Sequence, residues 1–391
     1  MTPVEILATC APADYQDWQW QQRNTLQSAD DLLKAFPGLR GTAQLSNIVQ
    51  HLGTRKVGIT PYFASLIETD ALGCPLPDDP LWRQVAPLWP AHTHNQHVPG
   101  NAFAYDGTAE NWELPGEMVT PICQHKYDNR VLVRTANICH AYCQFCYEAL
   151  RTLERNSQKQ AFRKSEWQLT LDYLVAHPEV DEVILSGGEP LMLSDRRLDE
   201  LLASLRAHRP EIIIRLHTRA LTFNPYRITD ELLAVLEKWN VNALGLHISH
   251  SREISEAFID ATMRLRKAVP VLFANMPLLA GINDNYPQLK TLCMRLYGLG
   301  IVPHYLYQFM PFSPGAEYFC TPLRSGIALV AQMKRRLSNL AVPEFVLPHR
   351  EGKYSVPLDL DKPAARLHQD ESGNEFMHFT NWQDAHCVFP Q

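Results

Sequence analysis

The sequence predicts an α/β protein whose main unit is a partial (βα)6 barrel. From Val131 onward, six short apolar runs alternate with amphipathic stretches, which is the pattern of parallel strands joined by helices. No G-x-G-x-x-G motif follows the first apolar run, and the chain contains no Walker-type phosphate loop. An incomplete barrel is therefore favoured over an open nucleotide-binding sheet.

The predicted elements divide the chain into three regions. Residues 1–125 are expected to form a helical region and an irregular connection, 126–340 the barrel, and 341–391 a C-terminal segment. The predicted strands are 131–136, 182–187, 212–218, 243–249, 269–275 and 304–309. The predicted helices are 165–176, 195–207, 229–239, 253–267, 286–298 and 323–339, with Thr229 as the N-cap of the third.

The composition limits the classes of partner and the compartment. Hydrophobic residues make up 46% and charged residues 20% of the 391 positions, which is ordinary for a globular protein with a buried core. The formal charge of −6 and the lack of a basic run argue against nucleic acid as a partner. No secretory pattern or long apolar run occurs, so a cytoplasmic protein without a membrane partner is expected. Nine cysteines, an odd number, favour metal ligation and free thiols in a reducing compartment.

Three cysteines lie close together directly after the first predicted strand. Cys139, Cys143 and Cys146 have the spacing C-x3-C-x2-C. A [4Fe–4S] cluster has four irons, so three thiolates leave one iron open to bind and reduce a small molecule. A structural zinc site prefers four closed ligands in paired spacings and fits less well. The position and spacing together are typical of the radical S-adenosylmethionine (SAM) superfamily, and a metal-stabilised binding module without chemistry is the alternative.

A second motif follows the next predicted strand. Gly187, Gly188 and Glu189 form a Gly-Gly-Glu turn, in which the glycines allow close approach of the backbone and the carboxylate is available to an ammonium group. An ordinary loop would also account for this turn if it stood alone. Its place one βα unit after the cysteines matches the segment that holds the amino group of SAM in radical SAM enzymes.

Further landmarks make the chain resemble the lysine 2,3-aminomutase family from Trp18 to Pro357. They are WQWQQRN, GITPYFASLI at 58–67, HKYDNRVLV at 125–133, SGGEPL, RITDELL at 227–233, GIND at 281–284, YLYQ at 305–308, TPLRSGI at 321–327 and REGKYSVP at 350–357. The resemblance implies a radical SAM enzyme that uses pyridoxal 5′-phosphate (PLP) to move an amino group. It also implies a small-molecule amino substrate, an electron donor such as flavodoxin or ferredoxin, and a homo-oligomer.

The resemblance also assigns cofactor contacts to named residues. Lys353 matches the lysine that links covalently to PLP, although the residues alone favour a solvated loop lysine. Such a lysine must be neutral when it attacks, which partial burial favours. Lys126, Tyr127 and Arg219 match PLP contacts, with Lys126 in place of an arginine. His247 matches a histidine near SAM, as does His250.

The chain departs from the family at the positions that bind substrate. The arginine that grips the substrate carboxylate is replaced by Glu148, and a carboxylate about 4 Å from it would meet repulsion of about 4 kcal/mol. The two aspartates that bind the distal amine of lysine are replaced by Met310 and Pro348, and the family's zinc cysteines have no counterpart. We therefore expect no zinc and a substrate other than L-lysine. The group of that substrate near Glu148 is expected to be cationic or a hydrogen-bond donor, or else its carboxylate meets a nearby base such as Arg151 or Arg155.

Two other outcomes stay open on sequence grounds. The same cofactors could support elimination or oxidation in place of migration. The chain could also act without PLP on a peptide or protein.

Overall fold

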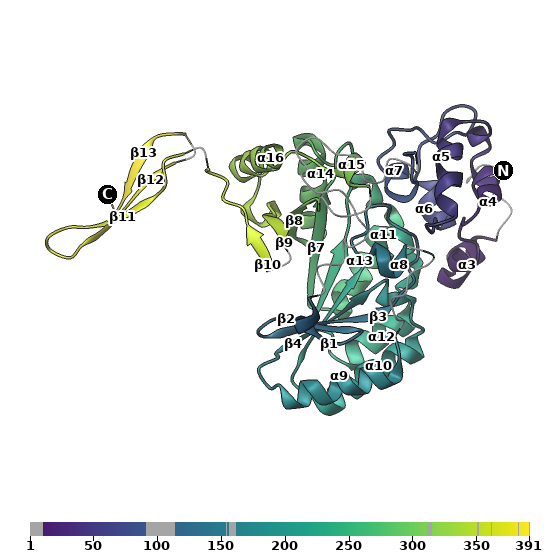
Figure 1. Ribbon diagram of the computed structural model, residues 1–391, viewed down its shortest axis with the longest axis horizontal. Coiled ribbons are helices and arrows are strands. Elements are labelled where there is room, and N and C mark those ends of the chain that lie inside the picture. The colour runs from purple at the N-terminus through teal and green to yellow at the C-terminus, as the bar shows by residue number, and fades with distance from the viewer. Residues whose placement is uncertain are drawn as a thin grey trace.

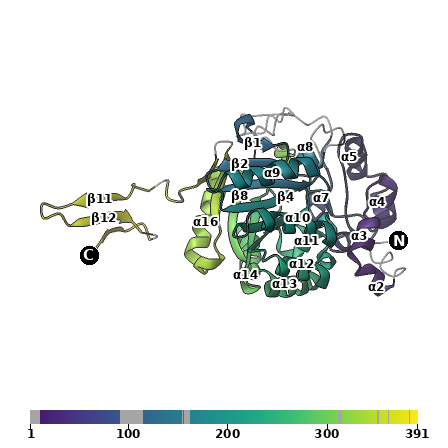
Figure 2. The same cartoon turned by 90° about the horizontal axis from the view of Figure 1, so that it is seen from below.

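The computed structural model describes residues 11–90, 114–153, 155, 162–310, 315–349, 352–360, 362–381 and 383–390. These residues form an N-terminal helical part, an open barrel and a small C-terminal sheet (Figure 1). The helical part lies at one end of the barrel, and the small sheet extends away from the opposite end in both views (Figures 1 and 2). Among the described helices, none combines the length and the apolar composition that a bilayer span requires.

The barrel contains a ten-stranded sheet in simple sequence order, from β1 to β10. Strands β3 to β9 are parallel, and antiparallel pairs extend the sheet at both edges. The strands are β1 (Met118–Thr120), β2 (Cys123–Tyr127), β3 (Arg130–Ala136), β4 (Glu182–Gly187), β5 (Ile213–Thr218), β6 (Ala243–His247), β7 (Val271–Leu278), β8 (Val302–Gln308), β9 (Glu344–His349) and β10 (Gly352–Ser355). The predicted α/β class and parallel sheet are confirmed.

Helices cover the outer face of this sheet (Figure 2). They are α9 (Lys164–Ala176), α10 (Asp195–His208), α11 (Ala220–Phe223), α12 (Asp230–Lys238), α13 (Glu256–Ala268), α14 (Tyr286–Gly298) and α16 (Leu323–Arg336). Two further short helices are α8 (Ala149–Thr152), which follows the cysteine loop, and α15 (Ala316–Phe319), which packs in a separate cluster with Trp89. Short 3-10 turns are η3 (Pro115–Glu117), η4 (Pro190–Met192), η5 (Pro225–Arg227), η6 (Ser251–Glu253) and η7 (Asn339–Ala341). As predicted, the Thr229 side chain caps α12 by accepting from the Leu232 amide.

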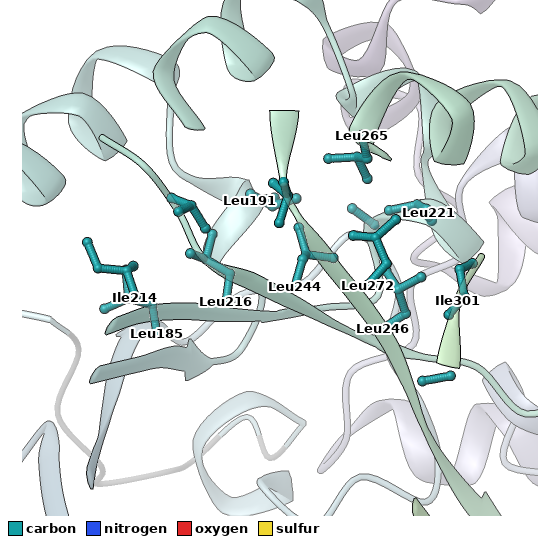
Figure 3. Close-up of a cluster of buried hydrophobic side chains, with 14 of the residues drawn as sticks. Leu185, Leu191, Ile214, Leu216, Leu221, Leu244, Leu246, Leu265, Leu272 and Ile301 are labelled. Carbon is teal, nitrogen blue, oxygen red and sulfur yellow. The ribbon is translucent and has the colours of Figure 1, made fainter. Parts of the chain in front are cut away.

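Strand alternation separates the core from the lumen of the barrel. On β5, Ile214 and Leu216 are buried in the main hydrophobic cluster, while the intervening Arg215 and His217 line an internal cavity. Figure 3 shows this cluster, in which leucines of neighbouring strands lie near Leu265 of α13. Because successive side chains point to opposite faces, polar residues at odd positions of β5 reach the cavity without disturbing the core.

The sheet is larger than the six strands predicted. β9 pairs in parallel with β8, and β10 returns antiparallel to β9, so the region assigned to a C-terminal segment begins inside the sheet. β7 continues to Leu278 instead of ending at Asn275. It passes through Pro277 because the pairing with β6 ends at Asn275 and that proline needs no hydrogen bond on that side.

The N-terminal helices hold the cysteine loop from one side. They are α2 (Pro12–Tyr15), α3 (Trp18–Arg23), α4 (Ala29–Ala35), η1 (Pro37–Leu39), α5 (Ala43–Leu52), α6 (Pro61–Ser65) and α7 (Trp82–Val85). Their separate apolar cluster includes Ala141 of the cysteine loop and Phe223 of α11. The amide of Tyr142 also donates to the Gly58 carbonyl at 3.0 Å. The predicted connection falls largely on residues 91–113, which lie outside the described part of the chain.

The C-terminal sheet has its own short antiparallel strands, which the sequence reading did not predict. They are β11 (Arg366–Gln369), β12 (Glu375–Thr380) and β13 (His386–Phe389). Leu367, Met377 and Phe389 are cross-strand neighbours on one face, and all three are exposed.

Candidate active site

One cavity of about 600 Å³ collects the residues singled out from the sequence. It runs along the lumen from the carboxyl ends of the parallel strands, where Gly187 and Thr218 line it, to their amino ends, where Arg130 and Glu182 line it, and it includes Lys353 of β10. The carboxyl ends are the place where barrel enzymes carry their active sites. The sequence-predicted residues that line it are Lys126, Tyr127, Cys139, Cys143, Cys146, Glu148, Gly187, Gly188, Glu189, Arg219, His247, Met310, Pro348 and Lys353. His250 does not line it. Its Nδ1 instead accepts from the Arg252 amide and caps η6.

The three loop cysteines form one end of the cavity. Burial raises the pKa of Cys146 to about 12, and nearby Cys143 adds to the effect. Burial likewise raises the pKa of Cys139. Buried thiols lose their protons when metal cations replace them. No three His, Cys, Asp or Glu side chains among the described residues converge closely enough for a single metal ion, which a larger multi-iron cluster does not require. The three thiols therefore fit a cluster held by one loop.

The paired glycines fasten this loop to β4. The amide of Gly188 donates to the Ala136 carbonyl at 2.6 Å, and the amide of Glu189 donates to the Ile138 carbonyl at 2.8 Å. A Cβ on Gly188 would lie 2.5 Å from the Ile138 oxygen, and Gly187 has a φ of +108°. Only glycine permits this approach, so the two glycines bring the cysteine loop and the β4 loop together.

Glu189 anchors the end of β5. Its carboxylate accepts from the Thr218 hydroxyl at 2.6 Å, the Arg219 amide at 2.7 Å and the Leu191 amide at 3.0 Å. Burial raises the pKa of Glu189, and these hydrogen bonds oppose the rise. The carboxylate expected to meet an ammonium group is thus already held by three protein donors, which gives it a positioning role that the sequence did not reveal.

Arg219 belongs to the cysteine end of the cavity. Its Nη1 lies 2.8 Å from Sγ of Cys143, and its Nη2 forms a buried ion pair of 3.0 Å with Glu253. Its Nη2 also donates to Gln84, and its Nε donates to Thr222. The guanidinium expected to contact PLP is therefore engaged with Cys143, a predicted cluster ligand, in this structure.

Lys353 lies at the opposite end. The residue as a whole is exposed on β10, but its Nζ lies 4.9 Å from the ring centre of Tyr305 and 5.4 Å from that of Tyr307, within the cavity. Burial of this amine, followed by the charges of Arg215 and Arg130, lowers the pKa of Lys353 to about 8. A substantial neutral fraction near physiological pH is what attachment to an aldehyde requires.

Two neighbouring residues of β2, Lys126 and Tyr127, line the same cavity as Lys353. The Tyr127 hydroxyl accepts from the Lys353 amide at 3.2 Å, and its ring lies 4.1 Å from the Arg130 guanidinium carbon. Lys126 pairs with Glu117 at 3.2 Å. Tyr127 thus contacts the predicted PLP lysine, whereas Lys126 only lines the cavity.

Several polar atoms between the two ends have no hydrogen-bond partner among the described residues. They are His217 Nε2, Ser249 Oγ, Asn275 Oδ1 and Gln308 Oε1, all from residues lining the cavity. Burial lowers the pKa of His247 to about 4 and the pKa of His217 well below its usual range, so both imidazoles are neutral at pH 7. Buried orphan groups in a cavity fit polar cofactors. The sequence offered one signal for three of them, since His217, Ser249 and Gln308 stand at or just beyond a strand end, whereas Asn275 lies within β7.

Glu148 has an environment that the sequence reading did not foresee. Its Oε1 accepts from Arg134 Nε at 2.9 Å, and its Oε2 lies 3.4 Å from Arg151 Nε, with all three side chains almost fully buried. The negative charge of Glu148, from which the sequence predicts repulsion of a substrate carboxylate, is therefore balanced by two arginines. Of the bases suggested for that carboxylate, neither Arg151 nor Arg155 lines the cavity, whereas Arg134 does.

Comparison with known proteins places this cavity in a family context. The radical SAM superfamily matches residues 133–291. An L-lysine 2,3-aminomutase of Fusobacterium nucleatum subsp. nucleatum is 31% identical over 345 residues, covering 88% of this chain and 76% of the relative. The enzyme of that name from Clostridium subterminale is 30% identical, with 90% and 80% covered. A putative L-lysine 2,3-aminomutase from Aquifex aeolicus is 31% identical, with 88% of each covered. The chain belongs to the lysine 2,3-aminomutase family.

As a member of this family, the protein is an enzyme of the radical SAM superfamily. A radical SAM domain implies SAM and an iron–sulfur cluster as cofactors. The loop with the three cysteines and the Gly187-Gly188-Glu189 turn together form one wall of the cavity, which is suited to SAM and the cluster.

Proposed function

We propose that this family member is a PLP-dependent radical SAM isomerase that moves an amino group on a substrate other than free L-lysine. The observation that carries the proposal is the shared cavity, which has three thiols at one end and an amine with a pKa near 8 at the other. The space between the two ends is bordered by polar atoms that have no hydrogen-bond partner among the described residues. Cofactors bound at the two ends would therefore not be separated by packed side chains.

The cofactors supply the reactive chemistry, since bound SAM and the cluster would generate a 5′-deoxyadenosyl radical and PLP would hold the substrate amine. The protein's own contribution is orientation. Cys139, Cys143 and Cys146 would ligate the cluster, and Lys353 would present a neutral amine to PLP. The apolar sides of Tyr305 and Tyr307 limit water around that amine.

Lysine is not expected as the substrate, because its second amine would find no negatively charged partner at Met310 and Pro348. Met310 and Pro348 line the cavity, and they stand at the positions where the resemblance expects the aspartates that bind the second amine. Neither side chain carries charge, so the ammonium of lysine would lose its hydration without gaining a partner.

Elimination or oxidation by the same cofactors is the second candidate, and a PLP-free reaction on a peptide is the third. Regeneration of SAM during turnover favours migration, whereas stoichiometric formation of 5′-deoxyadenosine favours oxidation. An external one-electron donor of the flavodoxin or ferredoxin kind, a reducing cytoplasmic setting and a homo-oligomer complete the proposal.

The test uses anaerobically purified, cluster-reconstituted protein. Borohydride reduction should fix a pyridoxyl group on Lys353, and Cys143→Ala should lose most bound iron and all SAM cleavage. Cys293→Ala, at a buried cysteine of α14 away from the cavity, is the matched control and should keep its iron. Full iron in Cys143→Ala, a label on another lysine, or L-lysine turnover above about 1 per second would each contradict the corresponding part.

A further inference from the structure

Strand pairing leaves an open seam between the two edges of the ten-stranded sheet. Its strands follow in order from β1 to β10, and within the described residues no strand pair joins β10 to the β1–β3 edge. β10 pairs only with β9, and three of its four residues are exposed. A short edge strand of this kind is among the least stable parts of a sheet. The strand that carries Lys353 therefore depends on contacts outside the strand pairing.

The amide of Lys353 points across this seam. Lys353 faces Pro348 in the β9–β10 pair, and proline has no N–H, so the two residues cannot exchange the two hydrogen bonds of a hydrogen-bonded pair. The Lys353 amide instead donates to the Tyr127 hydroxyl at 3.2 Å. A single side chain thus links β2, near one edge of the sheet, to β10 at the other edge.

Tyr127 lies where β2 is free to face β10. β1 pairs with β2 only at Cys123 and Gln124, so it does not extend to Tyr127. The guanidinium carbon of Arg130 lies 4.1 Å from the Tyr127 ring centre, a cation–π contact that orients the ring. On the other side, a Cβ built on Gly352 would lie 3.8 Å from Cε1 of the ring. The ring therefore packs beside the residue that precedes Lys353.

Lys353 is in this way held at two points. Its backbone is bonded to Tyr127, and its Nζ lies beside the rings of Tyr305 and Tyr307 of β8. The direction of a side chain in a strand is set by the backbone of that strand. A shift of β10 away from β2 would therefore withdraw the amine from the cavity.

We infer that Tyr127 is a positioning residue for Lys353, because its hydroxyl closes the seam of the barrel and holds β10 so that the amine stays in the cavity. The inference rests on the proposed function, which gives that amine its task, and deepens it. Tyr127 acts through the backbone of Lys353 before any cofactor arrives, whereas the resemblance assigns Tyr127 to contact with PLP itself.

The first experiment measures the exchange of the Lys353 amide with solvent in the full-length protein before PLP is added. Gly352-Lys353 is the only Gly-Lys pair in the sequence, so labelling with [13C-carbonyl]glycine and [15N]lysine marks this one amide in a carbonyl-correlated spectrum. Tyr127→Phe keeps the ring and removes the acceptor. The exchange should accelerate by about two- to tenfold, the effect of losing one hydrogen bond.

The matched control is the same substitution one residue after Lys353. Tyr354 is 56% exposed, so Tyr354→Phe should leave the exchange rate as it is. Arg130→Met removes the contact that orients the Tyr127 ring and should accelerate exchange to a smaller extent. This variant also keeps the test open if Tyr127→Phe does not fold.

The second experiment separates positioning from direct contact with PLP. The affinity for PLP is measured by equilibrium dialysis for Tyr127→Phe, for Lys353→Ala and for the double variant. If Tyr127 acts through Lys353, Tyr127→Phe should weaken PLP binding by about two- to tenfold when Lys353 is present and leave it unchanged in the Lys353→Ala background.

The outcomes that contradict the inference are distinct from those that contradict the proposed function. Unchanged exchange in Tyr127→Phe, equal acceleration in Tyr354→Phe, or an equal loss of PLP affinity in both backgrounds would overturn the inference. Failure of the wild-type protein to attach PLP would refute the proposed function, while the exchange of the Lys353 amide would still show whether Tyr127 holds β10.

Discussion

The Nη1 of Arg219 lies 2.8 Å from Sγ of Cys143. The guanidinium is fixed there by the buried Glu253 and by stacking 4.4 Å from the ring centre of Phe223. Hydrogen bonds and charge beside the ligand sulfurs set the reduction potential of an iron–sulfur cluster. A fixed positive charge stabilises the reduced form more than the oxidised form, because reduction adds an electron.

Arg219→Met should therefore lower the midpoint potential of the reconstituted cluster. The shift is about 43 mV for each kcal/mol of lost differential stabilisation in a one-electron couple, and Arg219→Lys should shift it less. A redox titration followed by electron paramagnetic resonance measures this without turnover. Arg252→Met, which removes an ion pair with Asp79 outside the cavity, is the control. An unchanged potential at full iron content in Arg219→Met would show that the contact does not act on the cluster.

Gly188→Ala should displace the cysteine loop. The added Cβ would meet the Ile138 backbone at 2.5 Å and 2.9 Å, and neither backbone atom can move without moving Cys139. We expect weaker SAM binding and reduced iron content, measured by equilibrium dialysis and iron assay. Gly298→Ala at the end of α14 has nothing within 4 Å of the new Cβ and should be neutral or raise stability by up to about 1 kcal/mol. Equal behaviour of the two variants would exclude the steric explanation.

The fold could be predicted where the pattern was local. β4 and α14 have the predicted bounds, because apolar runs and helical periodicity are properties of neighbouring residues. β9 and β10 were missed because their one apolar run, Phe345-Val346-Leu347, is only three residues long and ends at Pro348. They gain their place from pairing with β8, which is a contact between distant segments.

In the site, too, residues close in sequence could be predicted, whereas contacts that only the fold creates could not. Cys139, Cys143 and Cys146 lie on one loop, so spacing alone brings them together. The ion pair of Glu148 with Arg134 joins a strand to the loop after it, and only the folded chain shows that the charge of Glu148 is balanced. Orphan atoms such as Asn275 Oδ1 become recognisable only when their neighbours are known.

Lys353 should attach PLP with the pH dependence of a perturbed amine. Its pKa is lowered from 10.5 to about 8, first by burial and then by Arg215 and Arg130. The neutral amine is the nucleophile, so attachment should accelerate as pH rises through about 8 and level off above it. At pH 7 about one-tenth of such a lysine is neutral, against about three in ten thousand for an ordinary lysine. Stopped-flow absorbance of the apo-protein mixed with PLP, with Lys353→Ala as the background, measures the midpoint. A midpoint near 10 would contradict the role of burial.

Pro348→Asp should move that midpoint upward. Pro348 and Lys353 are directly paired across β9 and β10, and directly paired side chains lie on the same face with Cβ atoms about 5 Å apart. A carboxylate at this distance favours the protonated amine and should raise the pKa of Lys353 by about one unit or more. PLP attachment at pH 7 should then slow by about tenfold or more, because the neutral fraction falls with each unit. Pro348→Asn is the matched control, since it has nearly the same shape without the charge and should keep the original midpoint. If the Asp and Asn variants titrate alike, a charge at position 348 does not act on the pKa of Lys353, and the prediction is wrong.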